Sequence, residues 1–304
     1  KLILTMIKNL YELIEKAKSN PPKGIAVAAA EDASVLKAIK SAVEQGIVSP
    51  ILVGNQNEIE SLAKEMEFDI SNITIINNTK GAAVSAKLAV DEIRKGNAAI
   101  LMKGNISTGT LLKSVLNKEA GLRKADLLSH VAFFESPYYH KLLCVTDVAM
   151  NIAPDLNAKV HILKNAVDAY RKIGIDIPKV AVVTAVETVN PNMPATVDAA
   201  MLKVMNERNQ ITNCIVDGPL AIDNAVSKEA AIHKNSESDV AGDCDIILAP
   251  NIEAGNMFYK ALNFLGGASV AAVIMGASVP VVLTSRSDNE NSKLLSIALA
   301  AAMN

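Results

Sequence analysis

Four short apolar runs, each followed by a segment with helical periodicity, constrain the fold more than any other feature of this sequence. The runs occupy residues 25–30, 49–54, 73–76 and 98–103. Their length suits strands that are buried on both faces, and the helical segments between them supply the crossovers that parallel strands require. This alternation is typical of layered α/β proteins. We therefore predict an α/β fold in which a first domain is a doubly wound, mainly parallel sheet.

A second series of the same kind begins after residues 131–147, where two apolar runs flank a turn at Ser136-Pro137 and predict a hairpin. Further strands are predicted at 180–184, 213–219 and 245–250. A long amphipathic helix is predicted from apolar residues at spacings of 4, 3, 4 and 3, namely Leu156, Val160, Leu163, Val167 and Tyr170. We expect a second doubly wound α/β domain over 144–278, while 1–143 and a returning C-terminal segment, 279–304, form the first.

Residues 261–285 carry no charge and are long enough to span a membrane. Glycine, proline and polar side chains interrupt this segment, so we predict two short helices and a strand in a buried core. Residues 1–19 are predicted to form an amphipathic helix rather than a signal peptide, because polar residues break the apolar run and no small-residue cleavage site follows. The expected location is the cytoplasm.

The charge balance excludes partners that require a strong electrostatic field. The chain has 30 basic and 32 acidic side chains, with a formal net charge of −2. Nucleic acids and anionic membranes select strongly basic surfaces, so neither is an expected partner. An anionic small molecule would need a local pocket of positive charge.

The cysteines and histidines do not follow metal-binding or catalytic spacings. Cys144, Cys214 and Cys244 are far apart, which argues against a disulfide framework or a zinc site. The four histidines show no HxxxH or HExxH spacing, and no GxSxG elbow supports a Ser-His-Asp triad. We expect no metal site, and we expect the cysteines to be small buried apolar residues in a reducing compartment.

Residues 103–110, KGNISTGT, follow the fourth predicted strand and lead into a helix. Small residues at such a turn leave backbone N–H groups open to an anion, and Lys103 adds a positive charge. Alternatively, Ser107 or Thr108 is only an N-cap and Lys103 is solvated. The sequence leaves both interpretations open.

Arg286 differs from the other arginines because it follows an apolar strand, at 279–283, where an open sheet places its binding groups. Its guanidinium can hold a phosphate or carboxylate through two N–H groups. Ser285 and Asp288 occupy the same bend. The alternative is that Ser287 or Asp288 caps the last helix while Arg286 forms a salt bridge.

Seven segments, in this order, resemble the phosphate acetyl/butyryltransferase family, and most closely its phosphate butyryltransferase branch. They are MKGNISTGTLLKSVLNKEAGLR, LLSHVAFFE, TDVAMNIAPDL, NPNMPATVDAAML, DGPLAIDNAVS, PNIEAGNMFYKAL and PVVLTSRSDNENSKLLSIALA. The resemblance extends from residue 98 to the C-terminus. It implies two α/β domains of the isocitrate/isopropylmalate dehydrogenase-like type with a cleft between them, and a homodimer or higher homo-oligomer.

The resemblance also implies an activity, the reversible transfer of a short-chain acyl group, butyryl or branched, between coenzyme A and inorganic phosphate. No metal or nicotinamide cofactor takes part. Ser285 and Arg286 match a serine and an arginine of the family motif, whereas the family's aspartate base falls on Ser292. Asp288 is therefore the expected catalytic carboxylate, with Glu290 as an alternative. The expected substrate-binding residues are Lys103, Gly104, Asn105, Thr108 and Asn256.

Two other functions are compatible with the sequence. One is a metal- and NAD-dependent decarboxylating dehydrogenase of the same fold, which the scarcity of arginine opposes, since such an enzyme needs an arginine-rich pocket. The other is a sensor that binds acyl-CoA without turnover, which stays open because the base is unassigned.

Overall fold

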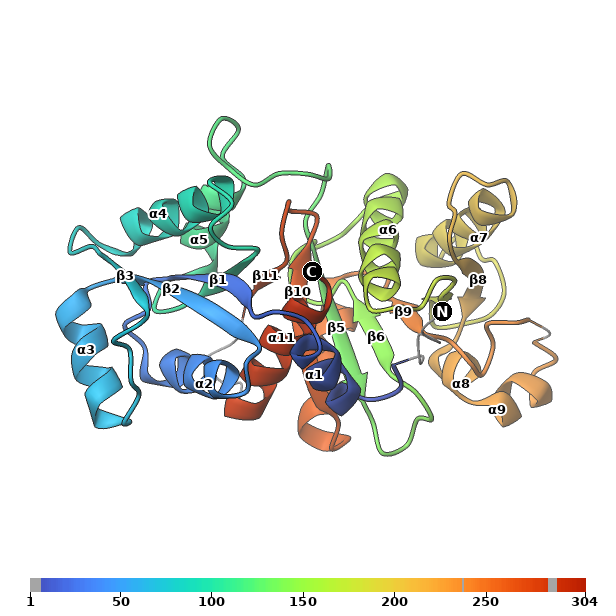
Figure 1. The fold of residues 1–304 in the computed structure, drawn as a ribbon. Coiled ribbons are helices and arrows are strands. Elements are labelled where there is room, and N and C mark those ends of the chain that lie inside the picture. Colours follow the sequence, from blue (N-terminus) through green and yellow to red (C-terminus); the bar gives the residue numbers. More distant parts are fainter. Residues whose placement is uncertain (1–6, 237, 284–288) are drawn as a thin grey trace. The chain divides into compact units, whose positions relative to one another are not determined.

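The computed structural model describes residues 7–236, 238–283 and 289–304 (Figure 1). Contacts between Cα atoms divide the chain into two compact units. Unit 1 comprises Lys1–Leu10 and Leu127–Val270, and unit 2 comprises Tyr11–Asp126 and Ala271–Asn304. The elements alternate between helices and strands, which confirms the predicted mixed α/β class. The domain bounds expected from the sequence remain a prediction.

Unit 2 contains a sheet whose strands follow the order β3-β2-β1-β4-β11-β10. The strands from β3 to β11 run parallel, and β10 pairs antiparallel with β11. In chain order they are β1 (Lys23–Ala28), β2 (Val48–Gly54), β3 (Thr74–Asn77), β4 (Ile100–Lys103), β10 (Ser269–Met275) and β11 (Val281–Val282). The central strand β1 has its residues from Ile25 onward fully buried, as its apolar sequence predicts.

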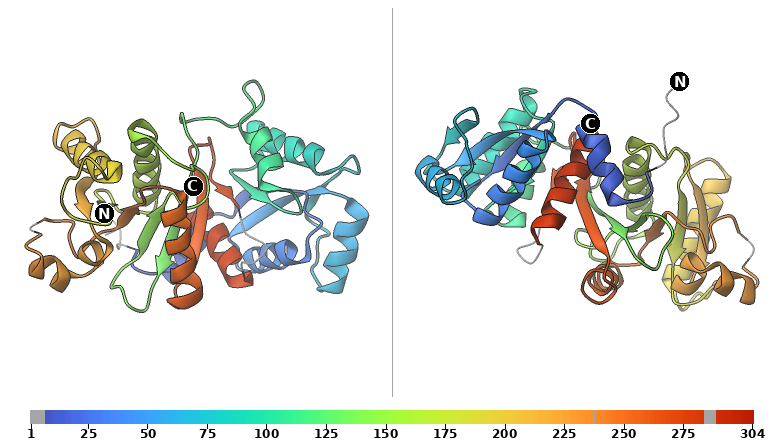
Figure 2. Two further views of the ribbon diagram at one scale, coloured as in Figure 1. Left: turned by 180° about the vertical axis from the view of Figure 1, so that it is seen from behind. Right: turned by 60° about the horizontal axis from the view of Figure 1, so that its bottom comes forward.

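Helices cover both faces of this sheet (Figures 1 and 2). Helices α2 (Ala33–Glu44) and α11 (Glu290–Ala302) lie on one face, and α4 (Ala82–Arg94) and α5 (Thr108–Val115) lie on the other. The remaining helices are α1 (Leu10–Lys18) and α3 (Gln56–Glu65). Asp32 begins α2 by accepting hydrogen bonds from the backbone N–H groups of Ser34 and Val35.

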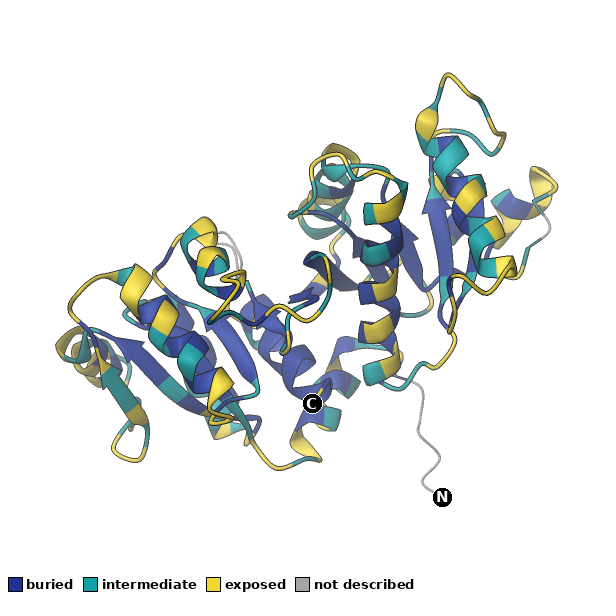
Figure 3. Ribbon diagram, turned by 90° about the horizontal axis from the view of Figure 1, so that it is seen from above, coloured by how far each residue is buried: buried dark blue, intermediate teal, exposed yellow. Residues whose placement is uncertain are grey.

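In the last helix, α11, every residue from Leu295 to Ala302 is buried, and all of them except Ser296 are apolar. Ser296 ties this helix to the sheet: its Oγ accepts a hydrogen bond from Ala272 N at 3.0 Å and donates to Ser292 O at 2.8 Å. Figure 3 shows that the buried residues are concentrated in the strands and in the helix faces turned toward them. The C-terminal segment therefore belongs to the core of unit 2.

Unit 1 contains strands in the order β5-β6-β9-β7-β8. β5 (Ser129–Glu135) and β6 (Leu143–Thr146) pair antiparallel, which confirms the predicted hairpin. β6, β9 (Ile246–Leu248), β7 (Lys179–Val183) and β8 (Ile215–Leu220) are parallel. At the amino ends of these strands Tyr170 donates to the carbonyls of Leu142 and Asp245 at 3.0 and 2.8 Å, so the end of α6 is fixed to the sheet.

The helices of unit 1 also lie on two faces (Figures 1 and 2). α6 (Leu156–Lys172) and α7 (Pro194–Glu207) are on one face, and the short helices α8 (Ile222–Val226) and α9 (Lys228–His233) are on the opposite one. The predicted stripe of α6 is buried at Val160, Leu163, Val167 and Tyr170. α10 (Ile252–Lys260) continues into a π-helical turn, η1 (Ala261–Leu265).

The prediction for residues 261–285 was wrong in detail. Instead of two helices and a strand, the described part contains η1 followed by the strands β10 and β11. The sequence of β10, SVAAVIM, is rich in β-branched residues and is buried from Val270 onward, so pairing within a sheet is favoured over a helix. Within the described residues, no helix combines the length and apolarity needed to cross a bilayer.

Candidate functional site

The carboxyl ends of β1, β4 and β11 lie at one edge of the unit 2 sheet, since these strands are adjacent and parallel. Lys103 ends β4 opposite Ala28 of β1, and Met102 pairs with Val282 of β11. Leu283, the last described residue before 284–288, therefore leaves β11 at the same edge as Lys103. This edge is the place where open sheets bind ligands.

Gly104 is needed at this edge because two backbones come very close. A Cβ atom at Gly104 would lie 2.0 Å from Ala29 O. The approach is fixed by hydrogen bonds from Gly104 N to Ala28 O at 2.9 Å and from Asn105 N to Ala29 O at 2.6 Å. Ala29 itself has a φ of 57°, in the left-handed region. Any side chain at position 104 would force β1 and β4 apart.

The loop after β4 brings together four of the predicted substrate-binding residues, Lys103, Gly104, Asn105 and Thr108. Lys103 is half-buried, with its Nζ 3.3 Å from Gly104 O, while Asn105 and Thr108 are exposed. Ser107 is the N-cap of α5, and its Oγ accepts a hydrogen bond from Thr110 N at 3.1 Å. The predicted N-cap is thus present, and the exposed loop with its lysine is compatible with an anion beside it.

The predicted catalytic residues Ser285, Arg286 and Asp288 lie outside the described residues. Glu290, the alternative carboxylate, is the first residue of α11 and lies 3.8 Å from Lys37 Nζ in an exposed ion pair. Asn289 caps α11 by accepting a hydrogen bond from Ser292 N at 2.7 Å, so the capping role expected of Ser287 or Asp288 belongs to Asn289.

Asn256, the remaining predicted substrate-binding residue, lies in unit 1. Its Nδ2 donates to Val148 O at 3.0 Å, in the loop that follows β6. Next to it, a Cβ atom at Gly255 would lie 2.3 Å from Asp147 O, so α10 packs closely against the end of β6. The described contacts of Asn256 connect α10 to this loop.

Asp147 organises the loop after β6, a role that sequence reasoning missed. The carboxylate is buried and accepts hydrogen bonds from the backbone N–H groups of Ala149, Met150 and Asn151. It also accepts one from Asn151 Nδ2 at 2.5 Å. These four hydrogen bonds satisfy a carboxylate that would otherwise be costly to bury. The sequence signal was an acidic residue directly at a strand end, followed by asparagine four residues later.

A cavity of about 530 Å³ lies at the carboxyl side of the unit 1 sheet. The amino-terminal ends of three helices line it, through the N-cap Asp155 and Leu156 of α6, Pro194 and Ala195 of α7, and the N-cap Asn251 of α10. Lys159 and Asp198 also line it, with Lys159 Nζ 2.6 Å from Asp198 Oδ2. The pair is 39 residues apart in the chain, so no sequence pattern predicts it.

Glu31 carries a buried carboxylate oxygen, Oε2, for which the described structure holds no hydrogen-bond partner. The atom lies against Gly54, where a Cβ would come within 1.8 Å of it. Glu31 follows β1 at the same sheet edge as Lys103. An unsatisfied buried acceptor costs about 1–3 kcal/mol, so a donor at this position would stabilise the edge.

The cysteines are buried and free, as predicted. Burial raises the pKa of the Cys214 thiol to about 11 and that of Cys244 to about 12, and it also raises the pKa of Cys144. Thiols with raised pKa values are poor nucleophiles at neutral pH. The described cysteines are thus unsuited to carry an acyl group.

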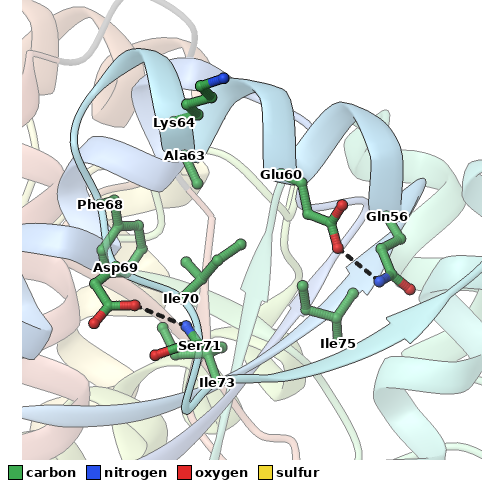
Figure 4. A pocket seen from close by; sticks show the side chains of 10 residues that line it. All are labelled: Gln56, Glu60, Ala63, Lys64, Phe68, Asp69, Ile70, Ser71, Ile73 and Ile75. Atoms are coloured by element: carbon green, nitrogen blue, oxygen red, sulfur yellow. Dashed lines mark hydrogen bonds between the residues drawn. The ribbon is translucent and has the colours of Figure 1, made fainter.

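Another surface hollow, of about 600 Å³, lies between α3 and β3 in unit 2 (Figure 4). Two pairs of its polar groups are hydrogen-bonded to each other: Gln56 Nε2 donates to Glu60 Oε1 at 2.7 Å, and Ser71 N donates to Asp69 Oδ1 at 3.0 Å. None of the predicted site residues lines it. Across the described residues, no group of three His, Cys, Asp or Glu side chains is placed to hold a metal ion.

Comparison with known proteins connects this geometry with a family. The pattern of the family described as Phosphate acetyl/butaryl transferase matches residues 9–87 and 81–301. The phosphate butyryltransferase of Clostridium acetobutylicum is 48% identical over 298 residues, covering 97% of this chain and 98% of that protein. The phosphate acetyltransferase of Thermotoga maritima is 44% identical over 292 residues, covering 96% and 98%.

A solved structure agrees with these sequence matches. The branched-chain phosphotransacylase of Enterococcus faecalis V583 superposes with a TM-score of 0.82 at 36% identity, covering 92% of this chain and 98% of that one. The family resemblance expected from the seven segments is therefore confirmed. The chain belongs to the phosphate acetyl/butyryl transferase family and is a phosphate acyltransferase.

Proposed function

We propose that this chain transfers a short-chain acyl group, butyryl or branched in preference to acetyl, between coenzyme A and inorganic phosphate. The preference is supported by the 48% identity to a phosphate butyryltransferase and by the 36% identity to a branched-chain phosphotransacylase. The proposal includes the doubly wound, two-domain architecture of the isocitrate/isopropylmalate dehydrogenase type, a cytoplasmic location and a homo-oligomeric state.

The observation that carries the proposal is the register of β4 and β11. Because Val282 pairs with Met102, the chain enters the segment that holds Ser285, Arg286 and Asp288 directly beside Lys103. Arg286 follows this edge in the sequence, and its guanidinium together with the Lys103 ammonium would supply the charge that an acyl phosphate requires. We assign phosphate binding to Arg286 and Lys103, aided by backbone N–H groups of the loop at Gly104, Asn105 and Thr108.

The reaction step then involves only the two substrates. The thiolate sulfur of coenzyme A attacks the carbonyl carbon of the acyl phosphate, a C–S bond forms, and the C–O bond to the phosphate breaks. Phosphate leaves with the electron pair. Ser285 hydrogen-bonds near the sulfur and the carbonyl oxygen, Asp288 takes the thiol proton, and Asn256 contributes to coenzyme A binding. A thiol pKa of about 8.5 means that a modest base is sufficient.

The test is the release of free coenzyme A from butyryl-CoA on addition of phosphate, followed with a thiol reagent. The buried cysteines of the enzyme keep the background low. Phosphate-dependent release is expected, with higher kcat/KM for butyryl- and isobutyryl-CoA than for acetyl-CoA. Tight coenzyme A binding without turnover would instead identify a sensor, and equal rates for all three substrates would contradict the chain-length preference.

A further inference from the structure

Lys293 lies in the first turn of α11 and is almost completely buried, with 3% of the residue exposed. Among the lysines that the structure describes, only Lys159 is buried to a similar degree, at 4%, and its ammonium pairs with Asp198. A buried ammonium is costly to desolvate, and the amino-terminal end of a helix is the less favourable end for a positive charge. Residue choices that oppose stability in this way are expected at functional sites.

The register of β11 with its two neighbours defines a row of residues at the carboxyl edge of the unit 2 sheet. Leu283 follows Val282, which pairs with Met102 of parallel β4, so Leu283 is level with Lys103. Because β10 is antiparallel and its Ile274 pairs two residues before Leu283, Ala272 is level with Leu283 as well. The row therefore runs from the end of β4 across the end of β11 to Ala272 of β10.

Ser296 fixes α11 over this row, since its Oγ accepts a hydrogen bond from Ala272 N at 3.0 Å. Residues 297–302 are all buried, so the helix runs from there back across the sheet, whereas residues 289–291 are exposed at its start. Lys293 is three residues before Ser296, so it lies on the same side of the helix and about 4.5 Å closer to the amino end. Helical side chains lean toward the amino end, which directs Lys293 past the end of β11.

The charged side chains at the starts of α11 and α2 are engaged with other groups. Glu290 of α11 lies 3.8 Å from Lys37 Nζ of α2, the helix against which α11 packs. Asp32, the N-cap of α2, accepts hydrogen bonds from two backbone N–H groups. Lys103 and Lys293 are thus the described cations on either side of the point where the chain leaves β11.

The acyl transfer assigned to this edge brings together more negative charge than two cations balance. The phosphoryl group carries about two negative charges near neutral pH, and the attacking thiolate adds a further one. Arg286 and Lys103 are assigned to the phosphoryl group, so the thiolate lacks a cation of its own. Lys293 supplies one at the same edge, and because it is buried its charge acts more strongly than that of an exposed lysine.

We propose that Lys293 is a further catalytic residue, whose ammonium contacts and stabilises the thiolate of bound coenzyme A. The proposal rests on the acyl-transfer function proposed above. When the S–H bond of the thiol breaks, the proton passes to Asp288 and the electron pair stays on the sulfur, beside the ammonium. The sulfur then forms the C–S bond to the acyl group as phosphate leaves. A neighbouring cation raises the fraction of a thiol that is ionised near neutral pH.

The test compares the binding of coenzyme A and of desulfo-coenzyme A, which lacks the sulfur, by isothermal titration calorimetry near neutral pH. The wild type should bind coenzyme A more tightly, because only this ligand provides a thiolate. Lys293→Met should weaken the binding of coenzyme A by roughly ten-fold and leave that of desulfo-coenzyme A unchanged. Lys293→Arg keeps the charge and should retain most of the difference. The matched control is Lys87→Met, an exposed lysine of α4, which should bind both ligands as the wild type does.

The dissociation constant for phosphate, measured in the same way, should be the same in Lys293→Met and the wild type. Equal affinities of Lys293→Met and the wild type for coenzyme A would overturn the proposal, as would an equal loss of affinity for coenzyme A and desulfo-coenzyme A. Weaker phosphate binding with intact coenzyme A binding would make Lys293 a phosphate ligand instead. A large fall of Tm in both Lys293→Met and Lys293→Arg, with no change in the ratio of the two coenzyme affinities, would assign Lys293 to folding.

The binding comparison separates this proposal from the proposed function. A wild type that shows no phosphate-dependent release of coenzyme A from butyryl-CoA would contradict the acyl-transfer function. The ratio of affinities for coenzyme A and desulfo-coenzyme A would still decide whether Lys293 stabilises a thiolate, because calorimetry requires no turnover.

Discussion

Lys159 on α6 and Asp198 on α7 form an ion pair of 2.6 Å, and only 6% of the lysine side chain and 23% of the aspartate side chain are exposed. The pair joins the two helices that cover one face of the unit 1 sheet and lines the cavity at its carboxyl side. A charge this deeply buried depends on its partner. Substitution of one partner is therefore expected to lower the stability of unit 1.

Asp198→Ala is expected to lower the free energy of unfolding by about 2–4 kcal/mol, because it leaves the Lys159 ammonium buried and unpaired. The partial exposure of Asp198 keeps the effect below that of a fully buried pair. Urea denaturation measures it. The double variant Lys159→Met with Asp198→Ala should recover much of the loss, since methionine fills a similar volume without a charge. A double variant less stable than Asp198→Ala would contradict this explanation.

Removing the cations at the unit 2 sheet edge should weaken phosphate binding. Arg286→Ala is expected to raise the KM for phosphate strongly, by roughly 10²-fold, and Lys103→Met by roughly ten-fold, because each charge-assisted contact contributes about 1.5–3 kcal/mol. Initial rates at varied phosphate and saturating butyryl-CoA measure these effects. Lys64→Met, which removes an exposed cation of α3, is the control and should leave the KM unchanged. An unaltered KM for phosphate in Arg286→Ala would show that Arg286 does not bind phosphate.

The role of Asp288 as the base is tested by the pH dependence of turnover in the direction from butyryl phosphate and coenzyme A to butyryl-CoA, where the thiol must lose its proton. Asp288→Asn should lower kcat mainly below a pH of about 8.5, where the coenzyme A thiol is protonated and a base is needed. At higher pH the thiolate forms without a base, so the kcat values of the wild type and Asp288→Asn should become equal. If the ratio of the wild-type kcat to the Asp288→Asn kcat is constant with pH, Glu290 or solvent is the base instead.

Asp243 should make the stability of unit 1 depend on acidic pH. Burial alone would raise the pKa of this carboxyl, but hydrogen bonds from Lys179, Lys141 and His140 outweigh burial and lower the pKa well below its ordinary value. A carboxyl with a lowered pKa stabilises the fold at neutral pH and loses that contribution as the pH falls below about 4.

The measurement for Asp243 is urea denaturation of the wild type and Asp243→Asn at pH 7 and pH 3. The stability difference between them is expected to be largest at pH 7 and to shrink at pH 3. Asp176→Asn, an exposed aspartate of the same unit, should show little effect at either pH. A difference that stays constant with pH would show that Asp243 contributes through packing rather than charge.

The cysteines should be inert in the native protein. Because Cys144, Cys214 and Cys244 are buried and burial raises their pKa values, a thiol reagent should modify them only after denaturation. Activity should survive treatment of the native enzyme with iodoacetamide. Rapid modification accompanied by loss of activity would place a cysteine in the reaction.

The sequence predicted those parts of the fold whose cause is local. The apolar runs that became β1 and β4, the stripe of α6 and the hairpin of β5 and β6 were all correct, because periodicity and chain length dictate them. The segment 261–285 was harder to predict, since an uninterrupted apolar run does not distinguish a buried strand from a buried helix. Hydrogen bonding to the neighbouring strand β11 in the sheet favours a strand for β10.

The residues of the candidate sites also differ in how far the sequence predicts them. Lys103, Gly104, Asn105 and Thr108 were recognisable because they are contiguous at a strand end, whereas Lys159 and Asp198 belong to different helices and meet only after folding. The sequence alone determined the α/β class, the free buried cysteines and the family. The tertiary structure decided which strand ends share an edge, which charges pair and which helix face stays exposed, because each of these depends on contacts between residues that are distant in the chain.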